Sequence, residues 1–195
     1  NRCRRQRQMC IRDSIYTHIS GIDLIRNEEG KFFVLEDNLR TPSGVSYMLE
    51  NREITRRLYP EMIPREKVQP ISDYPNLLYN KLKSLSNKKN PGVVMLTPGL
   101  YNSAYSEHTA LARLMGVELV EGSDLVVDNH YVFMKTAGGL KTVDVIYRRI
   151  DDDFLDPLNF KADSVLGVAG IMDSFRQGNV VPVSYTHLRA HETHE

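Results

Sequence analysis

GIDLIR at residues 21–26 and KFFVLEDNLRTPSG at residues 31–44 decide the fold of this sequence. Both runs begin with apolar, β-prone residues, and the four residues between them, NEEG at 27–30, have the composition of a tight turn. The pattern therefore predicts a β-hairpin whose second strand is ended by the Thr-Pro-Ser-Gly sequence at 41–44.

Polar side chains on this hairpin suggest a metal site. Side chains alternate along a strand, so Glu36 and Asn38 share a face. If the turn has two or four residues, residue numbers across the hairpin sum to 57, which sets Asp23 opposite Val34 and on the face of Glu36. Two carboxylates and an amide oxygen would then converge, and Mg²⁺ in a nucleotide site requires such hard oxygen ligands.

Two alternatives to this metal site remain open from the pattern alone. The charged residues could simply form the solvent face of an antiparallel sheet. A three-residue turn with Gly30 in a bulge would instead shift the register by one residue and scatter the three side chains.

The stretch after the hairpin predicts a helix over residues 45–58, with Ser43 as its N-cap. Free N–H groups and the positive end of the helix dipole favour an anion there, so Ser43 and Gly44 are candidate cofactor-binding residues. Plain capping by Ser43 is the alternative. Asp73 can cap a second helix, and a polar linker at 86–90 predicts a domain boundary.

Residues 91–182 have the pattern of an α/β domain with a parallel sheet. The expected elements are a strand over 93–96, a helix over 103–115, a strand over 117–120, a hairpin within 124–134, a strand over 142–149 and a helix over 163–177. The predicted class is thus α/β, with an α+β hairpin and helix region over 15–90 and a Rossmann-like domain over 91–182.

Few other residues in this domain suggest chemistry. The loop at 98–103 ends a strand and opens a helix, where α/β sheets bind ligands, which supports a substrate site weakly; a satisfied βα turn is the alternative. Arg148 and Arg149 point to opposite faces and precede three aspartates at 151–153, which predicts a local ion-pair network. His108 is expected to be structural or exposed rather than catalytic.

Both ends of the chain resemble translated sequencing adapter, at residues 4–13 and 183–193, and we expect 1–14 and 183–195 to contribute nothing to the fold. Without them, 19 basic residues face 22 acidic ones, a formal net charge of −3. Cys3 and Cys10 both lie in the first segment, so 15–182 has no cysteine, which fits a reducing compartment. The segment is expected to be a fragment of a longer protein.

Composition excludes several classes of protein. No apolar run of about eighteen residues and no signal peptide are visible, so the sequence predicts a cytoplasmic protein without membrane partners. The negative charge without a basic stripe disfavours nucleic acid as a partner. The oligomeric state cannot be inferred from the pattern.

Longer blocks carry a resemblance to a known family. These are GIDLIR, VLEDNLRTPSGVSYMLENR, LTPGLYNSAYSEH, GVELVEGSDL and VDVIYRRIDDDFLDP, in this order. Together they resemble the circularly permuted ATP-grasp type 2 family over residues 21–181. The resemblance implies a partial circularly permuted ATP-grasp fold, with ATP and Mg²⁺ as cofactors and Asp23, Glu36 and Asn38 as magnesium ligands.

One position departs from the family's pattern. Many ATP-grasp enzymes have an Arg two residues before the Asp, where this chain has Gly21, and Arg40 is the candidate catalytic residue that would supply the charge instead. The permutation also implies that the glycine-rich loop and lysines that hold the nucleotide follow residue 182.

The resemblance implies an ATP-dependent carboxylate–amine ligase. Such an enzyme forms an amide or peptide bond through an acyl phosphate, from small-molecule or peptide carboxylate and amine substrates. The fragment alone would be inactive. The alternative is a nucleotide- or metabolite-binding module whose ATP-grasp scaffold does not catalyse; the identity of the acid and the amine is not indicated.

Overall fold

The computed structural model describes residues 19–183, which fall into two compact units. One unit contains the hairpin up to Pro42 and also includes Val183, and the other runs from Ser43 to Pro182. The adapter-like residues 1–14 and 184–195 lie outside the described residues. Val183, which the sequence assigns to the adapter, is instead fully buried at the end of a strand.

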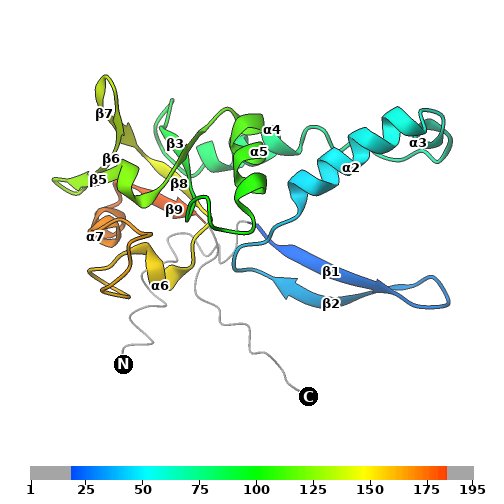
Figure 1. Ribbon diagram of the computed structural model, residues 1–195, viewed down its shortest axis with the longest axis horizontal. Coiled ribbons are helices and arrows are strands. Elements are labelled where there is room, and N and C mark those ends of the chain that lie inside the picture. Colours follow the sequence, from blue (N-terminus) through cyan, green and yellow to red (C-terminus); the bar gives the residue numbers. More distant parts are fainter. Residues whose placement is uncertain (1–18, 184–195) are drawn as a thin grey trace, which may run out of the picture. The chain divides into compact units, whose positions relative to one another are not determined.

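The first unit is an antiparallel hairpin of β1 (Gly21–Arg26) and β2 (Phe32–Asn38), as predicted (Figure 1). The amide of Asn27 donates to the carbonyl of Lys31, so the loop between them has three residues and ends at Gly30, whose φ is 83°. A left-handed residue at this position suits glycine, which has no Cβ to clash.

The register of this hairpin differs from the predicted one. Asp23 lies opposite Glu36 rather than Val34, and Leu24 is opposite Val34, so Leu35 is an extra residue in a β-bulge. The three-residue turn shifts the register by one, and the bulge shifts it by one again. The two shifts restore the parity, which is why Asp23 and Glu36 still share a face.

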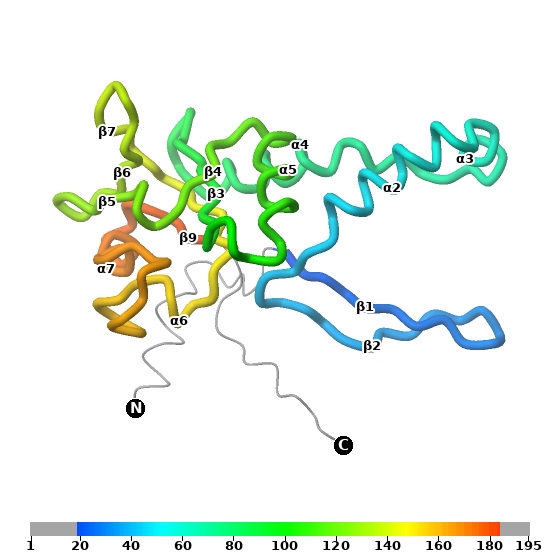
Figure 2. Tube along the Cα trace, viewed as in Figure 1, coloured from blue at the N-terminus to red at the C-terminus, as the bar shows by residue number. Residues whose placement is uncertain are grey.

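The second unit is built on a four-stranded sheet in the order β4-β3-β8-β9. Its strands are β3 (Val93–Leu96), β4 (Glu118–Val120), β8 (Val145–Arg148) and β9 (Val181–Val183). β3 is parallel to both β4 and β8, and α5 (Tyr105–Met115) connects β3 to β4, as the βαβ pattern predicts (Figure 2). The mixture of parallel and antiparallel sheets with helices is the expected α/β class.

A second sheet contains β5 (Leu125–Asp128), β6 (Tyr131–Thr136) and β7 (Gly139–Val143), all antiparallel. The prediction of one strand over 142–149 is wrong, because β7 and β8 belong to different sheets. The chain changes sheets at the buried Asp144, whose carboxylate accepts from Lys88 Nζ at 2.6 Å and from the Gly92 amide at 2.8 Å.

The helices of this unit are α2 (Val45–Leu58), α3 (Met62–Arg65), α4 (Tyr74–Lys83), α5, α6 (Asp152–Leu155) and α7 (Ile171–Arg176), and η1 is a short 3₁₀ helix (Gly122–Asp124). α5 packs against α2, α4 and β4. Both α2 and α4 thus belong to the same compact unit as the sheet, and the division between the two compact units falls at residues 42 and 43. The domain boundary expected at 86–90 stays a prediction.

The predicted helix over 163–177 is wrong in length, since only 171–176 are helical. Asp156, which is fully buried, accepts hydrogen bonds from the amides of Gly170 and Met172 at 3.1 and 3.0 Å. At Gly167 a Cβ would lie 2.0 Å from the carbonyl oxygen of Phe154. These contacts hold residues 163–170 in a compact loop instead of helical turns.

No helix among residues 19–183 is both long enough and apolar enough to cross a bilayer. The core of the second unit consists mainly of aliphatic side chains from the sheet and from the helices that pack on it. Its fully buried members include Leu82, Met95, Leu96 and Ile146.

Candidate functional site

The hairpin brings the three predicted magnesium ligands together on one face. Asp23 lies directly opposite Glu36, and Asn38 lies opposite Gly21, two pairs further from the turn and therefore on the same face. The Asn38 side-chain amide donates to Asp23 Oδ2 at 3.1 Å. Asp23 and Glu36 are exposed to solvent, so their carboxylates are accessible to an ion.

The chemistry of this donor set fits Mg²⁺. Two carboxylates and one amide are few, hard oxygen ligands, and they leave coordination positions for phosphate oxygens and water. No group of three or more His, Cys, Asp or Glu with metal-binding geometry occurs among the described residues, so a site here would also use the Asn38 amide oxygen. The metal role of the three residues stays a prediction.

Gly21 and Arg40 are neighbours in sequence of the candidate ligands: Gly21 precedes Asp23 by two residues, and Arg40 follows Asn38 by two. A Cβ on Gly21 would lie 2.8 Å from the Cβ of Pro42, so an Arg at this position would have to displace the proline. This explains in steric terms why Gly replaces the Arg of the family's pattern. Arg40 is exposed in the loop after β2, and its catalytic role stays a prediction.

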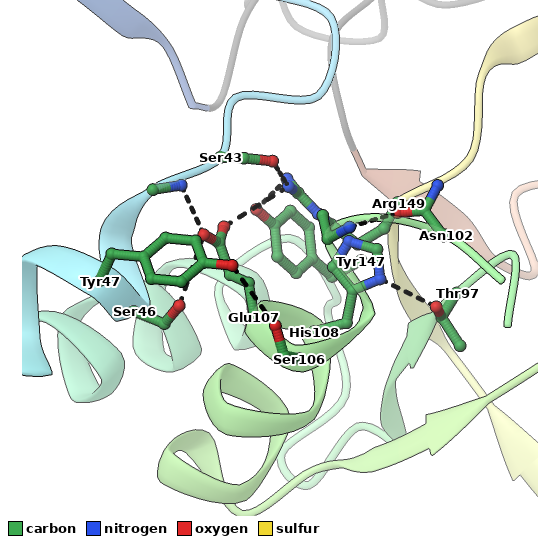
Figure 3. Close-up of polar contacts among 12 residues, drawn as sticks. Ser43, Ser46, Tyr47, Thr97, Asn102, Ser106, Glu107, His108, Tyr147 and Arg149 are labelled. Carbon is green, nitrogen blue, oxygen red and sulfur yellow. Dashed lines mark hydrogen bonds and ion pairs between the residues drawn. The ribbon is translucent and has the colours of Figure 1, made fainter. Parts of the chain in front are cut away.

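A second polar cluster lies in the other unit, at the carboxyl ends of β3 and β8. In the order β4-β3-β8-β9, the chain passes from β3 to β4 on one side and from β8 to β9 on the other side. The two connections therefore diverge between β3 and β8. Ligands in open α/β sheets bind at such a switch point. We call this second cluster the Glu107–Arg149 cluster: Ser43, Gly44, Thr97, Glu107, His108, Tyr147 and Arg149. Figure 3 shows this cluster and labels all of its members except Gly44.

The N-terminus of α2 is already bound to a carboxylate within this cluster. The amide of Gly44 donates to Glu107 Oε2 at 2.5 Å, and the Ser46 hydroxyl lies 3.4 Å from the same oxygen. The N-cap of α2 is Gly44, with φ 108°, so the prediction of Ser43 as N-cap is wrong. The anion expected at this helix end is the side chain of Glu107, on α5.

Arg149 contacts Ser43, Glu107 and Tyr147 within the cluster (Figure 3). Its Nη2 donates to Ser43 Oγ at 2.6 Å and lies 3.7 Å from Glu107 Oε1, and its Nη1 donates to the Tyr147 hydroxyl at 3.2 Å. The side chains of Arg149 and Glu107 are only 3% and 2% exposed, so their charges are almost fully desolvated. Burial raises the pKa of Tyr147, which therefore stays a neutral phenol.

The two adjacent arginines have different partners, as their opposite faces predict. Arg148 forms an ion pair with Asp152, one of the three aspartates that follow the strand. Arg149 pairs instead with Glu107, which is distant in sequence. The local ion pair that the sequence predicts is thus present for Arg148, and Arg149 also has a distant partner in Glu107.

His108 is a buried structural residue. Its Nδ1 lies 2.8 Å from Thr97 Oγ1, which also accepts a hydrogen bond from the Gly99 amide at 3.3 Å. Burial, and then the nearby positive charge of Arg149, lower the pKa of His108 to about 4. The imidazole is therefore neutral near pH 7 and makes a poor general base there.

The loop at 98–103 stands at this sheet edge, as predicted for a ligand-binding turn. Leu100 and Tyr101 are exposed, while Asn102 Oδ1 accepts from the Ala104 amide at 2.9 Å. This intraloop bonding is that of a satisfied βα turn, and a ligand role for the loop stays a prediction.

Sequence reasoning missed the role of Glu107. The residues at 107, 111 and 115 follow at intervals of four, and Leu111 and Met115 are buried with Glu107 on one face of α5. A carboxylate on the apolar stripe of a helix is a signal for a buried polar partner, because an unpaired charge there is costly. That partner, Arg149, was not identifiable from spacing.

Comparison with known proteins gives one family and a set of relatives. The family model described as circularly permuted ATP-grasp type 2 matches residues 2–185. An uncharacterized protein of Mycobacterium tuberculosis is 55% identical over 171 residues, which is 87% of this chain and 31% of the relative. An uncharacterized protein of Synechocystis is 54% identical over 168 residues, 85% of this chain and 35% of the relative.

A more distant relative has a functional name. A Frankia alni protein called "Putative glutamate–cysteine ligase 2-3" is 39% identical over 172 residues, 87% of this chain and 20% of the relative. The chain thus spans about a third of the length of the relatives with the higher identities, and a fifth of this one.

Proposed function

Because this chain belongs to the circularly permuted ATP-grasp type 2 family, we propose that the full-length protein is an ATP- and Mg²⁺-dependent carboxylate–amine ligase. The γ-phosphoryl group of ATP passes to a carboxylate oxygen, which gives an acyl phosphate and ADP. An amine then attacks the acyl carbon and expels inorganic phosphate, so that an amide bond forms.

The observation that carries the proposal is the shared face of Asp23, Glu36 and Asn38, with a hydrogen bond joining two of them. Bound Mg²⁺ would neutralise charge on the phosphate oxygens during transfer. The residues of this chain contribute by holding that ion with two carboxylates and one amide oxygen. The name of the Frankia alni relative agrees with ligation of an acid to an amine.

The substrates and location of the protein belong to the same proposal. Small-molecule or peptide acids and amines are the expected substrate class, and a cytoplasmic location fits a cysteine-free segment. The Glu107–Arg149 cluster does not supply a free anion site, because its guanidinium and its helix N-terminus already bind the carboxylate of Glu107.

Glu36→Gln in the full-length protein tests the proposal, because it keeps the size of the side chain and removes its charge. We expect kcat for ATP turnover to fall about 100-fold or more, the scale of a lost electrostatic stabiliser, while the protein still folds. Glu28→Gln at the exposed turn of the same hairpin is the matched control and should leave kcat unchanged.

The reaction class is tested by trapping the acyl phosphate with hydroxylamine across a panel of carboxylic acids. A hydroxamate that forms only with ATP, Mg²⁺ and the acid supports the ligase. Binding of ATP without hydroxamate from any acid, and without an effect of Glu36→Gln, would replace the ligase with the non-catalytic binding module.

A further inference from the structure

The turn between β3 and α5 holds two large apolar side chains in solvent. The amide of Asn102 donates to the carbonyl of Gly99 at 3.1 Å, so residues 99–102 form a β-turn after the carboxyl end of β3 (Figure 2). Its two central residues are Leu100 and Tyr101, which are 70% and 102% exposed. Glycine, proline and small polar residues dominate such positions, so the turn itself does not explain a leucine and a tyrosine there.

Contacts on both sides fix the backbone of this turn. The Gly99 amide donates to the buried Thr97 Oγ1 at 3.3 Å, and Asn102 Oδ1 accepts from the Ala104 amide at 2.9 Å. Gly99 has a φ of 96°, and a Cβ at this position would lie 2.9 Å from Glu121 Oε1. The two apolar side chains are thus presented on a fixed backbone, although they add almost no burial to the core.

The charge beside the turn is negative. Glu121, which follows β4, is exposed, and a carboxylate oxygen of its side chain lies next to Gly99, the first residue of the turn. Asp124 is a second exposed carboxylate in the same capping box, against one ammonium group, Lys135 Nζ, which donates to the Ser123 carbonyl at 2.7 Å. A ligand that contacts both the turn and Glu121 is therefore expected to carry a positive charge.

An anion suits this turn less well than a cation. The amides of Ala104 and Tyr105, at the start of α5, already donate to the side chain and the carbonyl of Asn102. Glu107 lies in the first turn of α5, so the positive end of the helix dipole is compensated within the protein. The ring of an exposed tyrosine, in contrast, attracts a cation through its quadrupole.

We propose that the turn at 99–102, together with Glu121, binds a cationic amine that carries an apolar group. The ammonium group binds to Glu121, and the apolar group packs on Leu100 and Tyr101. The position is the carboxyl edge of the parallel strands β3 and β4, where open α/β sheets bind ligands. The inference rests on the proposed function in one respect, namely that this ligand is the amine that the ligase joins to an acid.

An NMR titration of the isotope-labelled chain with phenethylamine tests this binding without ATP, Mg²⁺ or an acid. The present chain contains every residue named in the proposal, all within the unit from Ser43 to Pro182. We expect saturable shifts of the amides at 99–104 and 121–124, with a Kd of about 10 mM, the scale of so small a ligand. Phenylacetate has a similar ring and the opposite charge, and it should bind at least about fivefold more weakly.

Variants separate the two parts of the site. Tyr101→Ser removes the ring, and Glu121→Gln removes the charge but keeps an oxygen for the capping bond; each should raise the Kd for phenethylamine about fivefold. Leu158→Ser, at a loop position that is 72% exposed, and Glu118→Gln, at the other end of β4, are the matched controls and should leave the Kd unchanged. The dispersion of the amide spectrum reports whether each variant folds.

Three outcomes would overturn the inference. They are the absence of saturable shifts at the turn, equal affinity for phenylacetate, and shifts at the turn that depend on protein concentration alone, which would assign it to a contact between two copies. Hydroxamate trapping separates this inference from the proposed function, because hydroxylamine replaces the amine substrate. Hydroxamate formation without phenethylamine binding overturns this inference alone, and binding without any hydroxamate overturns only the proposed function.

Discussion

At the scale of single residues, the main finding is that Glu107 supplies the anion at the start of α2. Its carboxylate accepts from the Gly44 amide and lies beside the guanidinium of Arg149, with both side chains almost fully buried. The cluster therefore stabilises the second unit by satisfying a helix N-terminus and a buried cation with one carboxylate.

Glu107→Gln tests this role, since it keeps the shape of the side chain and removes the charge. We expect the free energy of unfolding to fall by about 3–5 kcal/mol, because a buried guanidinium loses its carboxylate partner. Chemical denaturation measures the change. Glu53→Gln is the control, since Glu53 pairs with Arg56 and Arg57 on the surface, where solvent screens the charges, so its effect on the free energy of unfolding should be much smaller.

The double variant Glu107→Gln/Arg149→Met separates the charge effect from packing. Removing both charges should cost less than the sum of the two single changes, by about 1 kcal/mol or more. Strict additivity would show that the two side chains do not interact energetically.

The pH dependence of stability tests the burial of His108. Its pKa is lowered from 6.5 to about 4 in the folded protein, so between these values the unfolded chain binds a proton that the folded chain does not. Stability should therefore rise with pH from about 4 to about 6.5, and this one group contributes at most about 1.4 kcal/mol per pH unit.

His108→Gln isolates that contribution from the titration of carboxylates. In urea denaturation at a series of pH values, the variant should have a shallower slope over this range than the wild-type protein, whatever its absolute stability. Identical slopes in the two proteins would mean that the imidazole titrates equally in the folded and unfolded states.

At the scale of elements, local patterns in the sequence predict most of the helices and strands. The hairpin, the helix at 45–58 and the β3–α5–β4 unit all have the predicted type and place, because each depends on periodicity and on nearby turn residues. Gly30 and Gly116 end their elements in left-handed conformations, which the sequence signals directly.

The errors arise where distant contacts decide. Residues 142–149 look like one strand, and only the bonds of Asp144 to Lys88 and Gly92 show why the chain changes sheets there. Residues 163–170 look helical, but Asp156 binds the amides that begin α7 and holds the loop in place. No window of sequence contains such partners.

The face that carries the candidate metal ligands was predictable from the local pattern of the sequence. The register of the hairpin was not. Alternation places Glu36 and Asn38 on one face by strand geometry alone. The position of Asp23 opposite Glu36 depends on two separate shifts of the strand register, one at the turn and one at Leu35. Only the shift at the turn has a signal in the sequence, which is Gly30. The correct face therefore came from an incorrect register.

At the scale of the whole molecule, the described residues form two units with different sources of stability. The unit from Ser43 to Pro182 has a core of its own, in which Met95, Leu96 and Ile146 are fully buried. The hairpin has paired backbones but no buried side chain among residues 21–38. The thermal stability of the chain should therefore come almost entirely from the larger unit.

A chain of residues 41–183, without the hairpin, tests this division. It keeps Ser43, Gly44 and the buried Val183, and therefore every contact of the Glu107–Arg149 cluster described above. We expect a cooperative thermal transition with Tm within about 3 °C of the longer chain, since about 1 kcal/mol corresponds to 2–4 °C at this size. Differential scanning calorimetry measures both. A Tm lower by more than about 10 °C, or loss of the cooperative transition, would show that the hairpin contributes to the core of the larger unit and is not an independent element.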